Sequence, residues 1–327
     1  MERLRMGNKK KQTRSILTNQ SNVLHLQQTS KDRNNMCVPG SAGSRYINFY
    51  TDFAFKKIFG TEANKDLLIS FLNALLDLKE SGEIIDLTYL NTEKLGDSIS
   101  DRRAIYDVYC QTMSGERFIV EMQNAKQDHF KDRSLYYSSF AIQEQAKKGA
   151  KDSRWDYSLS PVYVIGILDF VIDEKENVSD KVITRVKLKD DCNKTFSDKL
   201  NFIFLEMPKF RKTVDELETF VDKWLYVIKN LYHLEDKPSV LSEGVFDKLF
   251  EVAEIAAFSK NERYDYEENL KNFLDMYNIM RTVKNEGIAE GEVLGMQKMA
   301  KNLKNQGVDA NAIAIASGLS IEEIDKL

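Results

Sequence analysis

The feature that most constrains the fold is a pair of strand-like segments joined by a three-residue turn. Residues 105–112 and 117–123 both alternate in the way that strand residues do. The turn Met113-Ser114-Gly115 suits a hairpin, because glycine adopts the left-handed conformation that such a loop requires. In this register the numbers of opposite residues add up to 228. Asp107 is then predicted to lie across from Glu121, with the two Cβ atoms roughly 4.5–5.5 Å apart.

Two facing carboxylates destabilise a sheet, and a divalent cation held by oxygen ligands offsets their repulsion. The even-numbered residues from 106 to 110 and from 118 to 122 are apolar or aromatic, and they share one side of the predicted hairpin. Asp107, Glu121 and Gln123 share the other side. We therefore predict a Mg²⁺ or Mn²⁺ site at which Gln123 orients a water for phosphodiester hydrolysis. Two alternatives stay open: an exposed sheet face on which the acids are merely solvated, and a two-residue loop that places Met122 across from Asp107.

Other kinds of hydrolytic site are poorly supported. The three histidines and three cysteines are scattered, which argues against a zinc site, a Ser-His-Asp triad and a disulfide framework. We expect Cys110 to pack as a small apolar residue.

No segment resembles a membrane helix, and no apolar stretch follows the basic N-terminus, so a cytoplasmic protein without membrane contact is expected.

Charge is unevenly distributed along the chain. The net charge is -4, yet residues 1–45 hold nine Lys/Arg against two Asp/Glu, so the remainder is more acidic than the whole. Residues 1–44 are predicted to be a disordered basic arm. The arm either tethers nucleic acid through Lys9, Lys10, Lys11 and Arg14 or is a non-essential extension, and we favour the extension. The acidic remainder argues against a broad DNA-binding face, although a nuclease site adds acid locally.

The predicted elements indicate an α/β domain over residues 45–212 and a helical C-terminal region over residues 213–327. The expected order is α-α-β-β-β-α-β-β, from helices at 52–59 and near 67–76, strands at 84–90, 105–112 and 117–123, a helix at 128–148, and strands at 162–169 and 201–206.

At the hairpin the sequence resembles the PD-(D/E)XK nucleases, with an Asp on one strand, Glu-x-Gln on the next, and Gln123 in place of the usual Lys. More specifically it resembles the Rpn group of recombination-promoting nucleases and transposases, over roughly residues 46–325. The matching stretches are residues 52–60, Tyr106-Asp107-Val108, Val120-Glu121-Met122-Gln123, residues Arg133, Tyr136, Tyr137, Gln145 and Gly149, and residues 204–210.

The resemblance implies a restriction-endonuclease-like core with a mixed sheet flanked by helices, and Mg²⁺-dependent DNA cleavage linked to recombination or transposition. It implies that Asp107, Glu121 and the carbonyl of Met122 bind the metal, and that Asp52 completes the site from the first helix. Asp52 has an equally weighted alternative, a favourable interaction with the helix dipole.

Two departures from the motif affect the functional prediction. Tyr106 replaces the Pro before Asp107, which matters little. Gln123 replaces Lys, and a neutral amide positions water but supplies no positive charge, so activity is expected to be low or to rely more on the metal. The alternative function is a catalytically weak or inactive DNA-binding or assembly protein of a mobile element. Under a third hypothesis the chain is a helical interaction module of a mobile element or defence system. Such a module would bind neither DNA nor metal.

Several further residues are candidates for DNA contacts. Lys56 or Lys57 could touch a phosphate, and Arg133 could hold one bidentately, although each has a surface or ion-pair alternative. Tyr137, with Tyr136, could stack on a base, yet such a pair more often belongs to the core.

The C-terminal region carries a glycine repeat and a helix-turn-helix pattern. Gly287, Gly291 and Gly295 suit either close helix approach in a homo-oligomer or plain flexibility. Residues 310–327 are predicted to form helix, turn and helix, with a capping box between Ser320 and Glu323. Because the second helix is acidic, we favour a docking or oligomer element over a DNA-binding one.

Overall fold

The computed structural model describes residues 43–78, 82–94, 104–146, 157–172 and 179–327. The predicted arm, with Lys9, Lys10, Lys11 and Arg14, therefore lies almost wholly outside the described residues, as does Gly149. Contacts divide the chain after Tyr266, and the second unit is Glu267–Leu327. The sequence-based boundary at residue 213 falls inside the first of these units.

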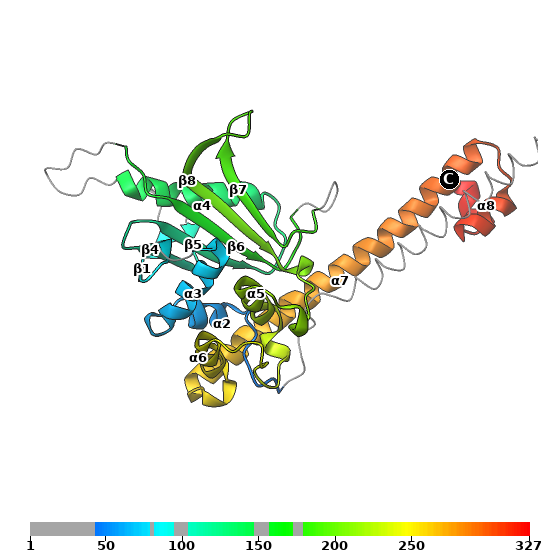
Figure 1. Ribbon diagram of the computed structural model, residues 1–327. Coiled ribbons are helices and arrows are strands. Elements are labelled where there is room, and N and C mark those ends of the chain that lie inside the picture. Colours follow the sequence, from blue (N-terminus) through cyan, green and yellow to red (C-terminus); the bar gives the residue numbers. More distant parts are fainter. Residues whose placement is uncertain (1–42, 79–81, 95–103, 147–156, 173–178) are drawn as a thin grey trace, which may run out of the picture. The chain divides into compact units, whose positions relative to one another are not determined.

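A six-stranded mixed sheet forms the centre of the first unit (Figure 1), in the order β1-β4-β5-β6-β8-β7. Its strands are β1 (Leu87–Tyr89), β4 (Val108–Thr112), β5 (Arg117–Gln123), β6 (Val162–Leu168), β7 (Ile183–Lys189) and β8 (Thr195–Glu206). Neighbours β5, β6 and β8 run parallel, whereas the pairs β1/β4, β4/β5 and β7/β8 are antiparallel. The predicted restriction-endonuclease-like α/β class, a mixed sheet flanked by helices, is confirmed.

The hairpin β4–β5 has the predicted register. Val108 pairs with Val120 and Cys110 with Phe118, so opposite residues add up to 228 as expected. Gly115 occupies the turn at φ +94° and donates its N–H to the Thr112 carbonyl at 3.1 Å. Since this φ is unfavourable for residues with a Cβ, the glycine determines the loop length and with it the register.

The strand predicted at 105–112 is interrupted at Asp107. Strand β4 begins only at Val108, and a separate strand β3 (Ala104–Ile105) pairs with β2 (Glu93–Lys94). The Tyr106 N–H donates to the Thr92 carbonyl at 3.1 Å instead of to β5. The β4–β5 ladder therefore ends next to Asp107, the residue that is predicted to bind the metal.

Other predicted strand limits also change. The segment predicted at 84–90 is a strand only over β1, and the segment predicted at 201–206 begins at Thr195 in β8. Strand β7 was not predicted, because alternating Arg185, Lys187 and Lys189 leave no apolar run. It is a strand because it pairs along the edge of β8.

Helices cover both faces of the sheet. Helix α4 (Phe130–Gln143) packs on one face, in a core that includes Tyr109, Ile119 and Phe204. Helices α2 (Asp52–Phe59), α3 (Lys65–Leu76), α5 (Phe220–Asn230) and α6 (Gly244–Ala253) contact one another. Contacts among the aromatic rings of Phe59, Phe71 and Trp224 join α2, α3 and α5. The polar hairpin side is thus covered by α4 rather than exposed.

Helix α7 (Lys260–Asn305) runs from the first unit into the second and carries all three glycines of the repeat. In the second unit, α8 (Ala310–Ser317) and α9 (Ile321–Lys326) form a small core from Ala300, Ile313 and Ile324. The predicted helix-turn-helix is confirmed, together with the capping box between Ser320 and Glu323. None of the helices in the described residues has the length and apolarity that crossing a membrane requires.

Candidate metal centre at the hairpin

Asp107 is tied to β5 by its side chain rather than by the ladder. Its Oδ2 accepts a hydrogen bond from the Met122 N–H at 2.9 Å, the position that a backbone carbonyl would take if β4 continued. The bend at Asp107 thus turns the carboxylate toward β5 and leaves its second oxygen for another partner. In an extended strand the N–H and C=O of one residue point to the same edge, so the Met122 carbonyl also faces the Asp107 side.

Glu121 is buried, with 7% of its surface exposed. Its Oε2 accepts a hydrogen bond from the Gln123 Nε2 at 3.1 Å. Its Oε1 is buried and has no hydrogen-bond partner among the residues that the structure describes. The alternative of a solvated acid on an exposed sheet face is therefore wrong for Glu121, because α4 covers that face.

The electrostatics of the pair favour a bound cation. Burial raises the pKa of Glu121 to about 8, and the nearby charge of Asp107 adds to the rise. Burial also raises the pKa of Asp107, while the hydrogen bond from Met122 opposes this effect. Charged carboxylates in such a place are costly unless a positive charge compensates them. The two carboxylates and the Met122 carbonyl are oxygen donors of the kind that hard divalent cations prefer, so the residues fit Mg²⁺ or Mn²⁺.

Arg133 of α4 lies beside this acid pair. Its Nη2 is 3.8 Å from the Glu121 Oε2, and its Nη1 donates to the Gln127 Oε1 at 2.7 Å. The guanidinium carbon lies 4.8 Å from the centre of the Tyr137 ring. The charge of Arg133 lowers the pKa of both Glu121 and Asp107. The structure therefore brings Arg133 to the predicted site.

The first helix contributes Asp52 and Lys56. Asp52 lies in the first turn of α2, as predicted, and pairs with Lys56 at 2.8 Å. The charges of both residues act on the Asp107 carboxyl, Asp52 raising its pKa and Lys56 lowering it. Lys57, by contrast, pairs with Glu262 at 2.7 Å. Of the two lysines, Lys56 is thus the one near the acid pair.

Tyr137 is engaged in packing. Its ring lies 5.5 Å from that of Tyr106, whose hydroxyl donates to the Tyr137 carbonyl at 2.9 Å. Tyr137 is partly buried against the core under α4. Tyr136, with 42% of its surface exposed, is the more accessible of the two rings. The core alternative for Tyr137 matches these contacts.

A small pocket lies between β5, β6 and α4, lined in part by Glu121, Arg133, Tyr137 and Gly166. Gly166 pairs directly with Glu121. A Cβ on Gly166 would come within 3.2 Å of side-chain atoms of Leu168 and Phe204. The glycine therefore keeps space open next to the buried carboxylate.

Two buried acids at the ends of parallel strands had no predicted role. Asp169 follows β6, and its N–H donates to the Gln123 carbonyl at 2.9 Å. Burial raises the pKa of Asp169 to about 7. Glu206 ends β8 and pairs with Lys209 at 3.0 Å. The one sequence signal for both is their position as the first charged residue after an apolar run, where open α/β sheets place ligands.

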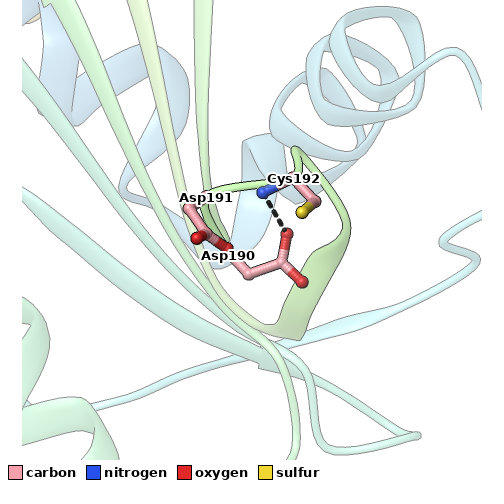
Figure 2. A group of neighbouring side chains, drawn as sticks. All are labelled: Asp190, Asp191 and Cys192. Atoms are coloured by element: carbon pink, nitrogen blue, oxygen red, sulfur yellow. Dashed lines mark hydrogen bonds between the residues drawn. The ribbon is translucent and has the colours of Figure 1, made fainter.

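A second acidic group, Asp190, Asp191 and Cys192, lies in the turn between β7 and β8 (Figure 2). All three residues are exposed. The Asp190 Oδ1 accepts hydrogen bonds from the backbone N–H groups of Cys192 and Lys194, at 3.0 and 2.8 Å. This carboxylate thereby stabilises the turn, which accounts for the cluster without an ion. Cys110, in contrast, is buried in the core as predicted.

A family model described as "PD-(D/E)XK nuclease family transposase" matches residues 49–283. This range includes all of the acids and cations described at the hairpin. No curated protein and no solved structure matches the chain.

Proposed function

Because the chain belongs to the PD-(D/E)XK nuclease family transposases, we propose that it is a DNA endonuclease that depends on Mg²⁺ or Mn²⁺ and acts in recombination or transposition. The single observation that best supports a metal centre is the buried Glu121 carboxylate. One of its oxygens has no hydrogen-bond partner among the described residues, and Asp107 lies next to it.

Each residue of the site has a proposed role. Asp107, Glu121 and the Met122 carbonyl hold the cation. A divalent cation there supplies positive charge to the phosphoryl group and makes an attacking water more acidic. Gln123 donates to Glu121 and so orients that carboxylate. Asp52 completes the site from α2.

Lys56 and Arg133 are the proposed DNA contacts, and Tyr137 supports Arg133. Lys56 and Arg133 carry positive charge next to the acid pair, where a scissile phosphate has to lie. The role of Tyr137 is indirect, because its ring supports the Arg133 guanidinium. Phosphate contacts of this kind determine position on DNA rather than sequence preference.

The test is cleavage of supercoiled plasmid with Mg²⁺, with Mn²⁺ and with chelator. Glu121→Gln and Asp107→Asn, which keep side-chain size, should lose the metal-dependent nicking that the wild type shows. Asp191→Asn, which neutralises an exposed acid of the β7–β8 turn, is the matched control and should cleave like the wild type. Equal cleavage by Glu121→Gln would indicate a contaminating nuclease.

The alternative is a DNA-binding or assembly protein with little or no activity. The neutral Gln123 at the position of the motif's lysine favours this alternative. It predicts DNA binding by gel shift without product under any metal condition. Under either function we propose a cytoplasmic location. We also propose self-association through the C-terminal helices, and sedimentation of the full chain compared with a truncation after Tyr266 would test this self-association.

A further inference from the structure

The site lacks the positively charged lysine that the family's motif contains. The family description names a lysine two residues after the second acid, and here that position is Gln123. Its amide is engaged with the Glu121 Oε2 at 3.1 Å. A neutral amide keeps Glu121 in place but cannot stabilise the negative charge that develops on a phosphoryl group during hydrolysis.

Arg133 places a positive charge on the same carboxylate from another element. Its Nη2 lies 3.8 Å from the Glu121 oxygen that Gln123 also contacts. The charge of Arg133 acts on both acids of the hairpin. The guanidinium therefore faces the same Glu121 oxygen as the side chain at the position of the motif's lysine, but it approaches from α4 instead of β5.

Arg133 is both oriented and accessible. The hydrogen bond to Gln127 and the Tyr137 ring hold the guanidinium in one plane. Its side chain is 32% exposed, whereas that of Glu121 is 10% exposed, so a substrate can reach the arginine from solvent. A planar guanidinium with several donors suits bidentate binding of phosphate oxygens.

The two lysines of α2 are less suited to this role. Lys56 is in a close pair with Asp52, at 2.8 Å, and both side chains are more than half exposed. Lys57 pairs with Glu262. Arg133 has a longer separation from its carboxylate, 3.8 Å, than either of these pairs.

We infer that Arg133 is a catalytic residue that supplies, from α4, the positive charge that Gln123 cannot supply to the scissile phosphate. This inference rests on the proposed function. In the reaction a water oxygen forms a new bond to phosphorus and gives up a proton to solvent. The bond from phosphorus to the leaving sugar oxygen breaks, and that oxygen takes the electron pair and then a proton. Arg133 binds the non-bridging oxygens throughout and stabilises their added charge.

The test moves the charge back to the strand. Arg133→Ala should lower kcat for plasmid cleavage by roughly a hundredfold or more, the usual effect of removing one transition-state donor. The double variant Gln123→Lys with Arg133→Ala should recover at least about tenfold of that loss, because a lysine on β5 then provides the charge. Lys131→Ala removes a charge from an exposed position on the same helix, two residues away, and should cleave like the wild type.

A binding measurement separates catalysis from DNA contact. In a Glu121→Gln background, which prevents turnover, Arg133→Ala should weaken DNA binding by less than about tenfold, since one phosphate contact among several is lost. Circular dichroism checks that each variant is folded. If Arg133→Ala cleaves plasmid as fast as the wild type, or if the double variant recovers none of the lost cleavage rate, this inference alone is overturned. Absence of cleavage by the wild type and by Gln123→Lys would overturn the proposed function and this inference with it.

Discussion

At the residue scale, the environment of the Glu121 carboxylate both disfavours and partly stabilises its negative charge. Glu121 is buried under α4, where its negative charge is disfavoured, and Asp107 lies close enough to disfavour it further. Gln123 and Arg133 offset only part of this cost. The raised pKa of about 8 favours the protonated form of Glu121 at neutral pH, and the proposed divalent cation would have to displace that proton as it binds.

This competition predicts how stability depends on pH. The pKa of Glu121 is about 8 in the folded chain, against an ordinary value of 4.5. Between these values the folded state holds a proton that the unfolded state has lost, so the free energy of unfolding of the metal-free protein should fall as pH rises from about 5 to 8. Urea unfolding in chelator at several pH values measures this dependence. Glu121→Gln, which cannot ionise, should show a shallower fall.

The control is a second buried acid. Asp169→Asn removes a group with pKa about 7 that lies outside the proposed metal site, so it should also reduce the pH dependence but leave the stabilisation by Mg²⁺ unchanged. With Mg²⁺ present the wild type should gain stability most at high pH. The same pH dependence in the wild type and Glu121→Gln would contradict the assignment of the raised pKa.

At the element scale, the hairpin explains which predictions succeeded. Its register followed from local chemistry, because Gly115 and the alternation of β5 are both visible in the sequence. The break at Asp107 was not predictable, since it depends on the Tyr106 N–H bonding to Thr92 and on a side chain replacing a ladder carbonyl. The approach of Arg133 to Glu121 depends on how α4 packs across the sheet, and strand alternation carries no information about that packing.

The turn itself offers a test of this explanation. Gly115 has φ +94°, and an added Cβ would lie 2.8 Å from the Ser160 Oγ. Gly115→Ala should destabilise the protein by about 1–3 kcal/mol, the usual cost of a residue in an unfavourable backbone region. Thermal unfolding measures the loss. Gly244→Ala, at a helix start with open space around it, should have little effect. An unchanged midpoint in Gly115→Ala would mean that β4 and β5 pair without help from the turn.

At the scale of the whole molecule, the charge distribution limits how the proposed DNA substrate can be bound. The chain carries a net charge of -4, while its first 45 residues are strongly basic. Under the proposed function, affinity for DNA would therefore have to come from a local group of positive side chains, such as Arg133 and Lys56, or from the N-terminal arm. These two sources differ in how binding responds to salt, because each phosphate contact releases counterions.

Removal of residues 1–44 distinguishes the two sources. If Lys9, Lys10, Lys11 and Arg14 each neutralised a phosphate, truncation would reduce the slope of log affinity against log salt by roughly 3.6, about 0.9 for each contact. We expect instead an unchanged slope and unchanged plasmid cleavage, because the residues proposed for metal and phosphate binding all lie between Asp52 and Tyr137. The slope is measured by fluorescence anisotropy of labelled duplex at several salt concentrations, in the Glu121→Gln background so that the DNA stays intact. A large drop would make the arm a nucleic-acid tether and would explain how an acidic chain reaches its substrate.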